Sequence, residues 1–182
     1  MLQMEHKDYI FEIVSVLMRG SNHIRGISNS IKTNHMMVVR KINSLEKMNV
    51  VDYRIEGRNK TYFLKDSPEA RGYVLMAEDY RLMGLLSKYP FLREVISKIQ
   101  KDRKIGLAFV FGSYAKGTET KRSDIDIYFE SQDASLKKEY SKDSKFSVKL
   151  GKWDKNNFLI KEIIDNHILL KGGEKYYEKV FG

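Results

Sequence analysis

A Gly-Ser pair and an Asp-x-Asp triplet, each beside a short apolar segment, constrain the fold of the C-terminal half more than any other feature. Residues 105–111 are an apolar run too short for a core helix, which predicts a buried strand. Gly112 and Ser113 follow directly, and after ten further residues Asp124 and Asp126 open a second predicted strand. Because side chains alternate along a strand, the two aspartates share one face and the apolar residues point to the other.

Two carboxylates on one face repel each other unless a positive charge lies between them, which favours a divalent cation at Asp124 and Asp126. Ligands that are all oxygen suit Mg²⁺ or Mn²⁺ rather than zinc. The chain has no cysteine and four scattered histidines, which excludes disulfides, thiol catalysis and a thiolate zinc site.

The string FGSYAKGTETKRSDIDIYF, residues 111–129, resembles the minimal nucleotidyltransferases of the DNA polymerase beta superfamily. The resemblance implies a mixed sheet with helices over about the last 80 residues. It implies that Gly112, Ser113 and Lys116 bind a nucleoside triphosphate, and that Asp124 and Asp126 are catalytic and bind Mg²⁺ or Mn²⁺. A nucleoside monophosphate would pass to a hydroxyl acceptor, and by analogy a HEPN-type protein is a candidate partner.

The family usually takes a third carboxylate from the next strand, and this chain has none there. Residues 145–150 carry Ser147 and Lys149 where an aspartate is expected. That carboxylate commonly deprotonates the acceptor hydroxyl, so whether the domain is an enzyme stays open. The alternative is a transcriptional regulator whose domain is catalytically inactive and senses nucleotide or mediates dimerisation, with Lys149 replacing the charge of one metal.

The N-terminal segment has the pattern of a helix-turn-helix followed by a β-hairpin. Apolar residues recur at helical spacing in three segments and alternate in two. Thr33 or Asn34 is the expected cap of the third helix. The stretch INSLEKMNVVDYRIEGRNKTYFL resembles the winged-helix family over roughly the first 65 residues. The predicted helices are 8–18, 24–31 and a third that starts after its cap at Thr33 or Asn34 and has its buried stripe at 38–48. The predicted strands are 50–55 and 60–64.

Basic residues are concentrated in this segment, which favours DNA as a partner. Between Arg19 and Lys60 there are nine basic and three acidic residues, in a chain of net charge +9. A solvated basic face, a protein-interaction module and sequence-independent RNA binding remain alternatives. The residues expected to meet base edges are Thr33, Asn34, His35 and Met36, and those expected to contact phosphates are Arg40, Lys41, Arg58 and Lys60.

The fold class expected is α+β, with a winged helix-turn-helix at 1–66, a helical connector at 67–103 and a nucleotidyltransferase-like domain at 104–182. Ser67 and Pro68 begin a long connector helix, which we expect either to be buried between the two domains or to serve in homodimerisation. A homodimer is expected. We further expect a helix from 158 that leads into an apolar strand, and a last helix at 174–180. The chain has no apolar run of roughly 20 residues and no secretory signal at its start, so we expect a cytoplasmic protein without a membrane anchor.

Overall fold

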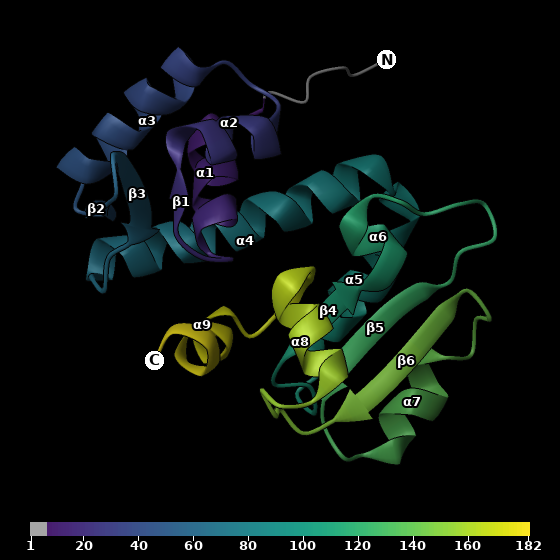
Figure 1. The fold of residues 1–182 in the computed structure, drawn as a ribbon. Helices are drawn as coiled ribbons and strands as arrows, with labels where there is room; N and C mark the ends of the chain where they lie inside the picture. Colours follow the sequence, from purple (N-terminus) through teal and green to yellow (C-terminus); the bar gives the residue numbers. More distant parts are fainter. Residues whose placement is uncertain (1–6) are drawn as a thin grey trace. The chain divides into compact units, whose positions relative to one another are not determined.

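The computed structural model describes residues 7–182, and its internal contacts divide the chain into a unit that ends at Tyr80 and a unit that begins at Arg81. Residues 1–6, the start of the predicted N-terminal domain, lie outside the described residues. Both units combine helices with a β-sheet, which confirms the α+β class (Figure 1). Within residues 7–182, no helix is both long enough and apolar enough to cross a membrane.

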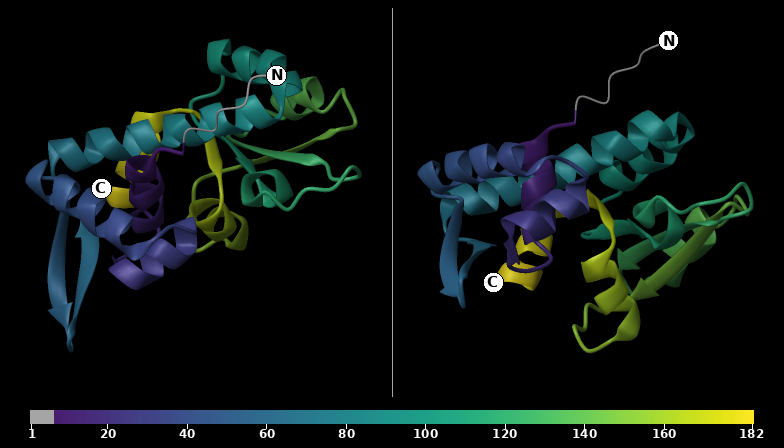
Figure 2. Two further views of the ribbon diagram at one scale, coloured as in Figure 1. Left: turned by 90° about the horizontal axis from the view of Figure 1, so that it is seen from above. Right: turned by 45° about the horizontal axis from the view of Figure 1, so that its top comes forward.

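The N-terminal unit has the winged-helix arrangement of three helices and a small antiparallel sheet, in the strand order β1-β3-β2. The β2–β3 hairpin extends away from the helices (Figure 2). β1 was not predicted, because a two-residue strand is too short to show alternation. The elements are α1 (Tyr9–Leu17), β1 (Asn22–His23), α2 (Ile24–Ile31), α3 (His35–Lys47), β2 (Val51–Glu56) and β3 (Asn59–Leu64).

The start of α3 shows why this helix begins where it does. Asn34 is the N-cap, and its side chain accepts a hydrogen bond from the backbone N–H of Met37 at 2.8 Å. This satisfies one of the amides that have no partner within the helix. The predicted apolar stripe is confirmed, since Val38, Ile42 and Leu45 are fully buried.

The segment 67–103, predicted as a connector, is shared between the two units. It contains α4 (Pro68–Lys88), the 3-10 helix η1 (Pro90–Leu92) and α5 (Arg93–Lys101). Ser67 caps α4, accepting from the N–H of Ala70 at 3.1 Å. The division at residue 80 falls inside α4, and α5 packs in the core of the C-terminal unit.

The C-terminal unit is built on a four-stranded sheet in the order β6-β5-β4-β7. β5 and β6 are parallel and the other pairs are antiparallel, so the sheet is mixed. Helix α7 was not predicted. The strands are β4 (Ala108–Phe111), β5 (Ile125–Glu130), β6 (Phe146–Gly151) and β7 (Ile168–Lys171), and the helices are α6 (Gly112–Lys116), α7 (Ala134–Tyr140), α8 (Phe158–Asp165) and α9 (Gly173–Phe181).

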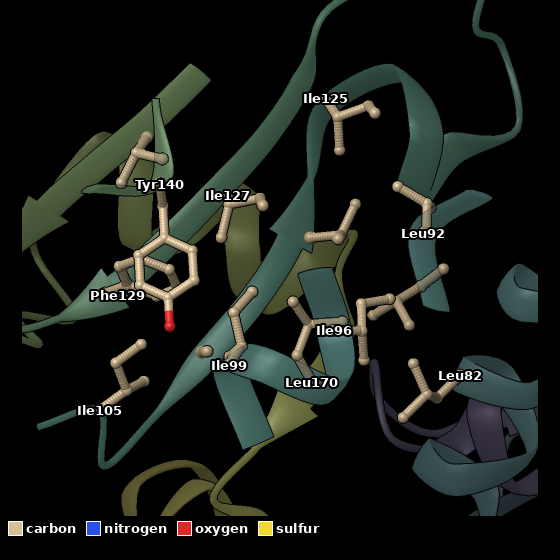
Figure 3. Packing of buried hydrophobic residues seen from close by; sticks show 14 of the residues in the cluster. Leu82, Leu92, Ile96, Ile99, Ile105, Ile125, Ile127, Phe129, Tyr140 and Leu170 are labelled. Carbon is tan, nitrogen blue, oxygen red and sulfur yellow. The ribbon is translucent and has the colours of Figure 1, made fainter. Parts of the chain in front are cut away.

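The two faces of this sheet bury different kinds of side chain. On one face the isoleucines of β5 pack with Ile96 and Ile99 of α5 (Figure 3). On the other, Phe109 is the centre of a group of rings at centroid distances of 5.1–6.4 Å. Those rings belong to Tyr128, Trp153, His167 and Tyr176. Asp126 alternates with Ile125 and Ile127, and therefore lies on the face of the rings.

Candidate functional site

Gly112 and Asp126 are in direct apposition where β4 ends. Phe111, the last residue of β4, pairs with Asp126 of β5, so the next residue lies against the aspartate. Gly112 has a φ of +68°, a conformation that costs an L-residue energy. A Cβ on Gly112 would come within 2.6 Å of Oδ2 of Asp126. The backbone geometry and the close carboxylate therefore both require glycine.

The two aspartates occupy different environments. Asp124 immediately precedes β5 and is exposed, whereas Asp126 lies within the strand and is partly buried. Burial raises the pKa of Asp126 above its ordinary value, and the nearby charges of Asp124 and Glu162 raise it further. A hydrogen bond from Ser147 and the charge of Lys149 oppose that rise. An additional positive charge nearby would therefore stabilise the ionised form of Asp126.

The strand beside Asp126 supplies no carboxylate. In the parallel register of β5 and β6, Ser147 pairs with Asp126 and Lys149 pairs with Tyr128. Residues 7–182 contain no group of three or more acidic, histidine or cysteine side chains placed to hold a metal ion. The oxygen donors of Asp124, Asp126 and Ser147 suit one Mg²⁺ or Mn²⁺ ion, but they do not form the three-carboxylate set of a two-metal centre.

Lys116, expected to bind nucleotide, has a partner that the sequence did not indicate. Its Nζ lies 2.8 Å from Oε1 of Glu162, on α8. The pair joins the helix that opens at Gly112 to a helix 46 residues further along the chain. Glu162 is also near enough to Asp126 to raise its pKa. Periodicity places Glu162 on a helix but does not show which residue it meets.

A second ion pair fixes the loop that leads to Asp124. The carboxylate of Glu119 accepts from Lys88 at 2.8 Å and from the hydroxyl of Tyr89. The hydrogen bonds from Lys88 and then Tyr89 lower the pKa of Glu119 to about 2. The ring of Tyr89 meets the ring of Tyr114 on α6 with centroids 5.0 Å apart. This cluster ties the loop and α6 to the end of α4.

The predicted DNA-contacting residues of α3 have different surroundings. Asn34 uses its side-chain oxygen as the helix cap, while His35 and Arg40 are exposed and Thr33 and Lys41 are half-buried. Two further exposed residues lie on the same stripe as Arg40 and were not predicted as DNA contacts. Their steps along the helix keep them on one face with the exposed Met36. These residues are Asn43 and Lys47.

The hairpin carries the other predicted phosphate contacts. Arg58 lies in the turn between β2 and β3, where it is exposed and has no ion pair or hydrogen bond with residues 7–182. Lys60 lies over the ring of Tyr53, with Nζ 3.6 Å from the centroid. Arg54 is held by Glu56 at 2.5 Å and by Ser21 at 3.0 Å. Arg58 is therefore the least constrained cation of the hairpin.

Comparison with known families agrees with the C-terminal geometry. Residues 93–175 match the family model "Polymerase beta, Nucleotidyltransferase". We refer to this segment as the nucleotidyltransferase-like domain. The match begins at the first residue of α5, so it includes a helix that lies within the predicted connector 67–103. No curated protein matches the chain.

The solved structures similar to this chain share low identity with it. One is the homodimeric winged helix-turn-helix DNA-binding domain of a Mycobacterium bovis protein: identity 20%, TM-score 0.36, covering 39% of this chain and 66% of that chain. The transcriptional repressor BigR of Xylella fastidiosa has 13% identity and a TM-score of 0.34, covering 47% and 75%. ZitR of Lactococcus lactis has 18% identity and a TM-score of 0.39, covering 54% and 74%.

Three acidic residues at or beyond the ends of β5 and β6 have local partners. Glu130 forms ion pairs with Lys175 at 2.6 Å and Lys179 at 2.8 Å. Asp143 and Asp154 accept from backbone N–H groups two residues further on, at 3.0 and 2.9 Å. None of the three pairs with Asp126 in the sheet. Ser147 therefore occupies the β6 position where the resemblance leads us to expect a carboxylate.

Proposed function

We propose that this chain is a DNA-binding regulator whose nucleotidyltransferase-like domain binds a nucleoside triphosphate with Mg²⁺. The apposition of Gly112 and Asp126 carries the nucleotide half of the proposal. The turn that the resemblance assigns to phosphates and the carboxylates it assigns to the cation meet at this point. The family match over residues 93–175 supports the same assignment.

The residues of the site have separate roles in this proposal. Asp124 and Asp126 hold the cation, which would neutralise the carboxylates and the phosphates together. The first amides of α6 have no partner within the helix, so the backbone at Gly112 and Ser113 can donate to phosphate oxygens. Lys116 supplies a further charge once it leaves Glu162.

The N-terminal unit supplies DNA binding in this proposal. Arg40 and Lys47 lie on the exposed stripe of α3, and Arg58 lies in the hairpin turn. These side chains suit a helix in the major groove and a hairpin along the phosphates. We infer that two copies bind together, because winged-helix proteins commonly read two half-sites.

Calorimetric titration of ATP and GTP, with and without Mg²⁺, tests the nucleotide half. We expect Mg²⁺-dependent binding that is lost when Asp124 and Asp126 are both replaced by Asn. Asp154→Asn is the matched control, because it removes a carboxylate that accepts only a local backbone hydrogen bond. Absence of nucleotide binding in the unmodified protein would reject this half of the proposal.

Fluorescence anisotropy with labelled DNA tests the other half. We expect the unmodified protein to bind duplex DNA and the double variant Arg40→Ala, Arg58→Ala to bind at least tenfold more weakly, an effect of about 1.4 kcal/mol or more. Equal affinities would assign DNA binding to another surface. Light scattering of the free and DNA-bound protein measures the number of copies.

Nucleotidyl transfer is the second candidate, and the presence of both Asp124 and Asp126 favours it. The reaction would join a nucleoside monophosphate to an acceptor hydroxyl and release pyrophosphate. Against it stands Ser147, since a serine is a poor base for that hydroxyl. A HEPN-type protein as acceptor rests on the resemblance alone. Incubation with α-labelled ATP and HEPN-type proteins, followed by measurement of pyrophosphate, tests this candidate.

A further inference from the structure

On β6, the candidate site is lined by a neutral residue, Ser147, and a basic residue, Lys149. Ser147 pairs with Asp126, and Lys149 follows two residues later on the same face of the sheet. Diagonal neighbours on a sheet face are about 7–8 Å apart at the backbone, which a lysine side chain can span. Lys149 is exposed and has no ion pair with residues 7–182. Its ammonium is therefore available to a ligand at Asp126.

The site has less negative charge than two neighbouring divalent cations need. Two such ions in one centre lie about 3.5–4 Å apart. They repel each other about four times as strongly as two unit charges at that distance, because the interaction scales with the product of the charges. Three carboxylates offset this repulsion in the family pattern. Here Asp124 and Asp126 face the site, Glu162 lies near Asp126 but pairs with Lys116 at 2.8 Å, and Lys149 adds a positive charge.

We propose that the nucleotidyltransferase-like domain holds a single divalent cation with its nucleotide, and that Lys149 supplies the second positive charge. The domain then binds a nucleoside triphosphate without transferring its nucleotidyl group. This inference rests on the proposed nucleotide binding. It assigns the domain the role of a nucleotide sensor.

Lys149 gives the site a property that a two-cation centre lacks. Its charge is present without any metal, so the triphosphate retains part of its affinity when Mg²⁺ is removed. A hydroxyl at Ser147 neither takes the proton of an acceptor nor binds a second cation strongly. Ser147 and Lys149 therefore favour binding of the nucleotide over transfer of its nucleotidyl group.

Counting Mn²⁺ ions tests this inference directly. The full chain is saturated with an ATP analogue that has a methylene group between its α- and β-phosphates, and free Mn²⁺ is followed by electron paramagnetic resonance. We expect one Mn²⁺ per protein–nucleotide complex in the unmodified protein and two in Ser147→Asp. Ser144→Asp, in the exposed turn before β6, is the control for added charge and should keep one.

Lys149→Met provides a second readout that does not depend on the folding of Ser147→Asp. We expect metal-free binding of ATP to weaken about tenfold, which corresponds to about 1.4 kcal/mol. Two Mn²⁺ ions in the unmodified protein, or unchanged metal-free affinity in Lys149→Met, would overturn the inference. Failure of the unmodified protein to bind ATP under any condition would instead reject the proposed function itself.

Discussion

Gly112 shows how one residue position can combine a backbone requirement with close contact to a residue of the proposed site. Its φ of +68° disfavours any side chain, and its Cβ position is occupied by the carboxylate of Asp126. Gly117, at φ +70°, has the same backbone requirement but open space around its Cβ position. Comparing substitutions at the two glycines therefore separates the effect of backbone strain from the effect of contact with Asp126.

We predict that Gly117→Ala lowers the free energy of unfolding by roughly 1–2 kcal/mol, the cost of the left-handed conformation, and that Gly112→Ala lowers it further because its Cβ meets the Asp126 carboxylate. Only Gly112→Ala should also displace Asp126 and abolish Mg²⁺-dependent nucleotide binding. Urea unfolding and calorimetry measure the two effects. Equal nucleotide binding by both variants would show that Asp126 is not in the site.

At the scale of elements, the loop before β5 is held by Glu119. The folded pKa of Glu119, about 2, lies below the ordinary glutamate value of 4.5. A depressed carboxyl pKa stabilises the fold fully above the unfolded value, and the contribution is lost as pH falls from about 4.5 towards 2.

We therefore predict that Glu119→Gln lowers the free energy of unfolding at pH 6 and that the difference from the unmodified protein disappears as the pH approaches 2. Urea unfolding at a series of pH values measures this. Asp143→Asn, in an exposed turn, is the comparison for the loss of a carboxylate elsewhere. A difference that stays constant with pH would mean that Glu119 does not form the ion pair with Lys88 in solution.

The β2–β3 hairpin gives a second prediction at this scale. Arg58 is free for a phosphate, whereas Arg54 is already bound to Glu56 and Ser21. Arg58→Ala should weaken DNA binding at every sequence and reduce the slope of log affinity against log salt by about 1. Arg54→Ala should change both much less. Anisotropy titrations at several salt concentrations decide this, and equal effects would contradict the assigned roles.

At the scale of the whole molecule, Trp153 is a local probe because it is the only tryptophan and lies in the C-terminal unit. Its ring meets that of Phe109 at 5.6 Å. Each unit has its own buried side chains, so we expect separate unfolding transitions by circular dichroism, only one of which tryptophan fluorescence follows.

We predict that Mg²⁺ and ATP at a hundred times the Kd stabilise the C-terminal unit by about 2.7 kcal/mol and raise its midpoint on the order of 10 °C. Thermal unfolding followed by fluorescence measures this shift, and Asp126→Asn should abolish it. The midpoint of the other transition should not move. A single transition that shifts as a whole would show that the two units unfold together.

The sequence by itself determined the helices and strands whose periodicity is local. The steps of Val38, Ile42 and Leu45 predicted α3, and the spacing from Gly112 to Asp126 predicted the strands on either side of the site. It missed α7 and β1, and it placed α5 in the connector. α5 belongs to the C-terminal core through contacts that no neighbouring residue specifies.

Tertiary structure decided which distant residues meet. The pairing of Lys116 with Glu162, of Lys88 with Glu119 and of Asp126 with Ser147 depends on strand register and helix packing. These partners are 46, 31 and 21 positions apart, well outside the range of helix and strand periodicity. Residue types and local spacing therefore determine the elements and name the candidate ligands, whereas the sheet register determines that Ser147 lies directly beside Asp126.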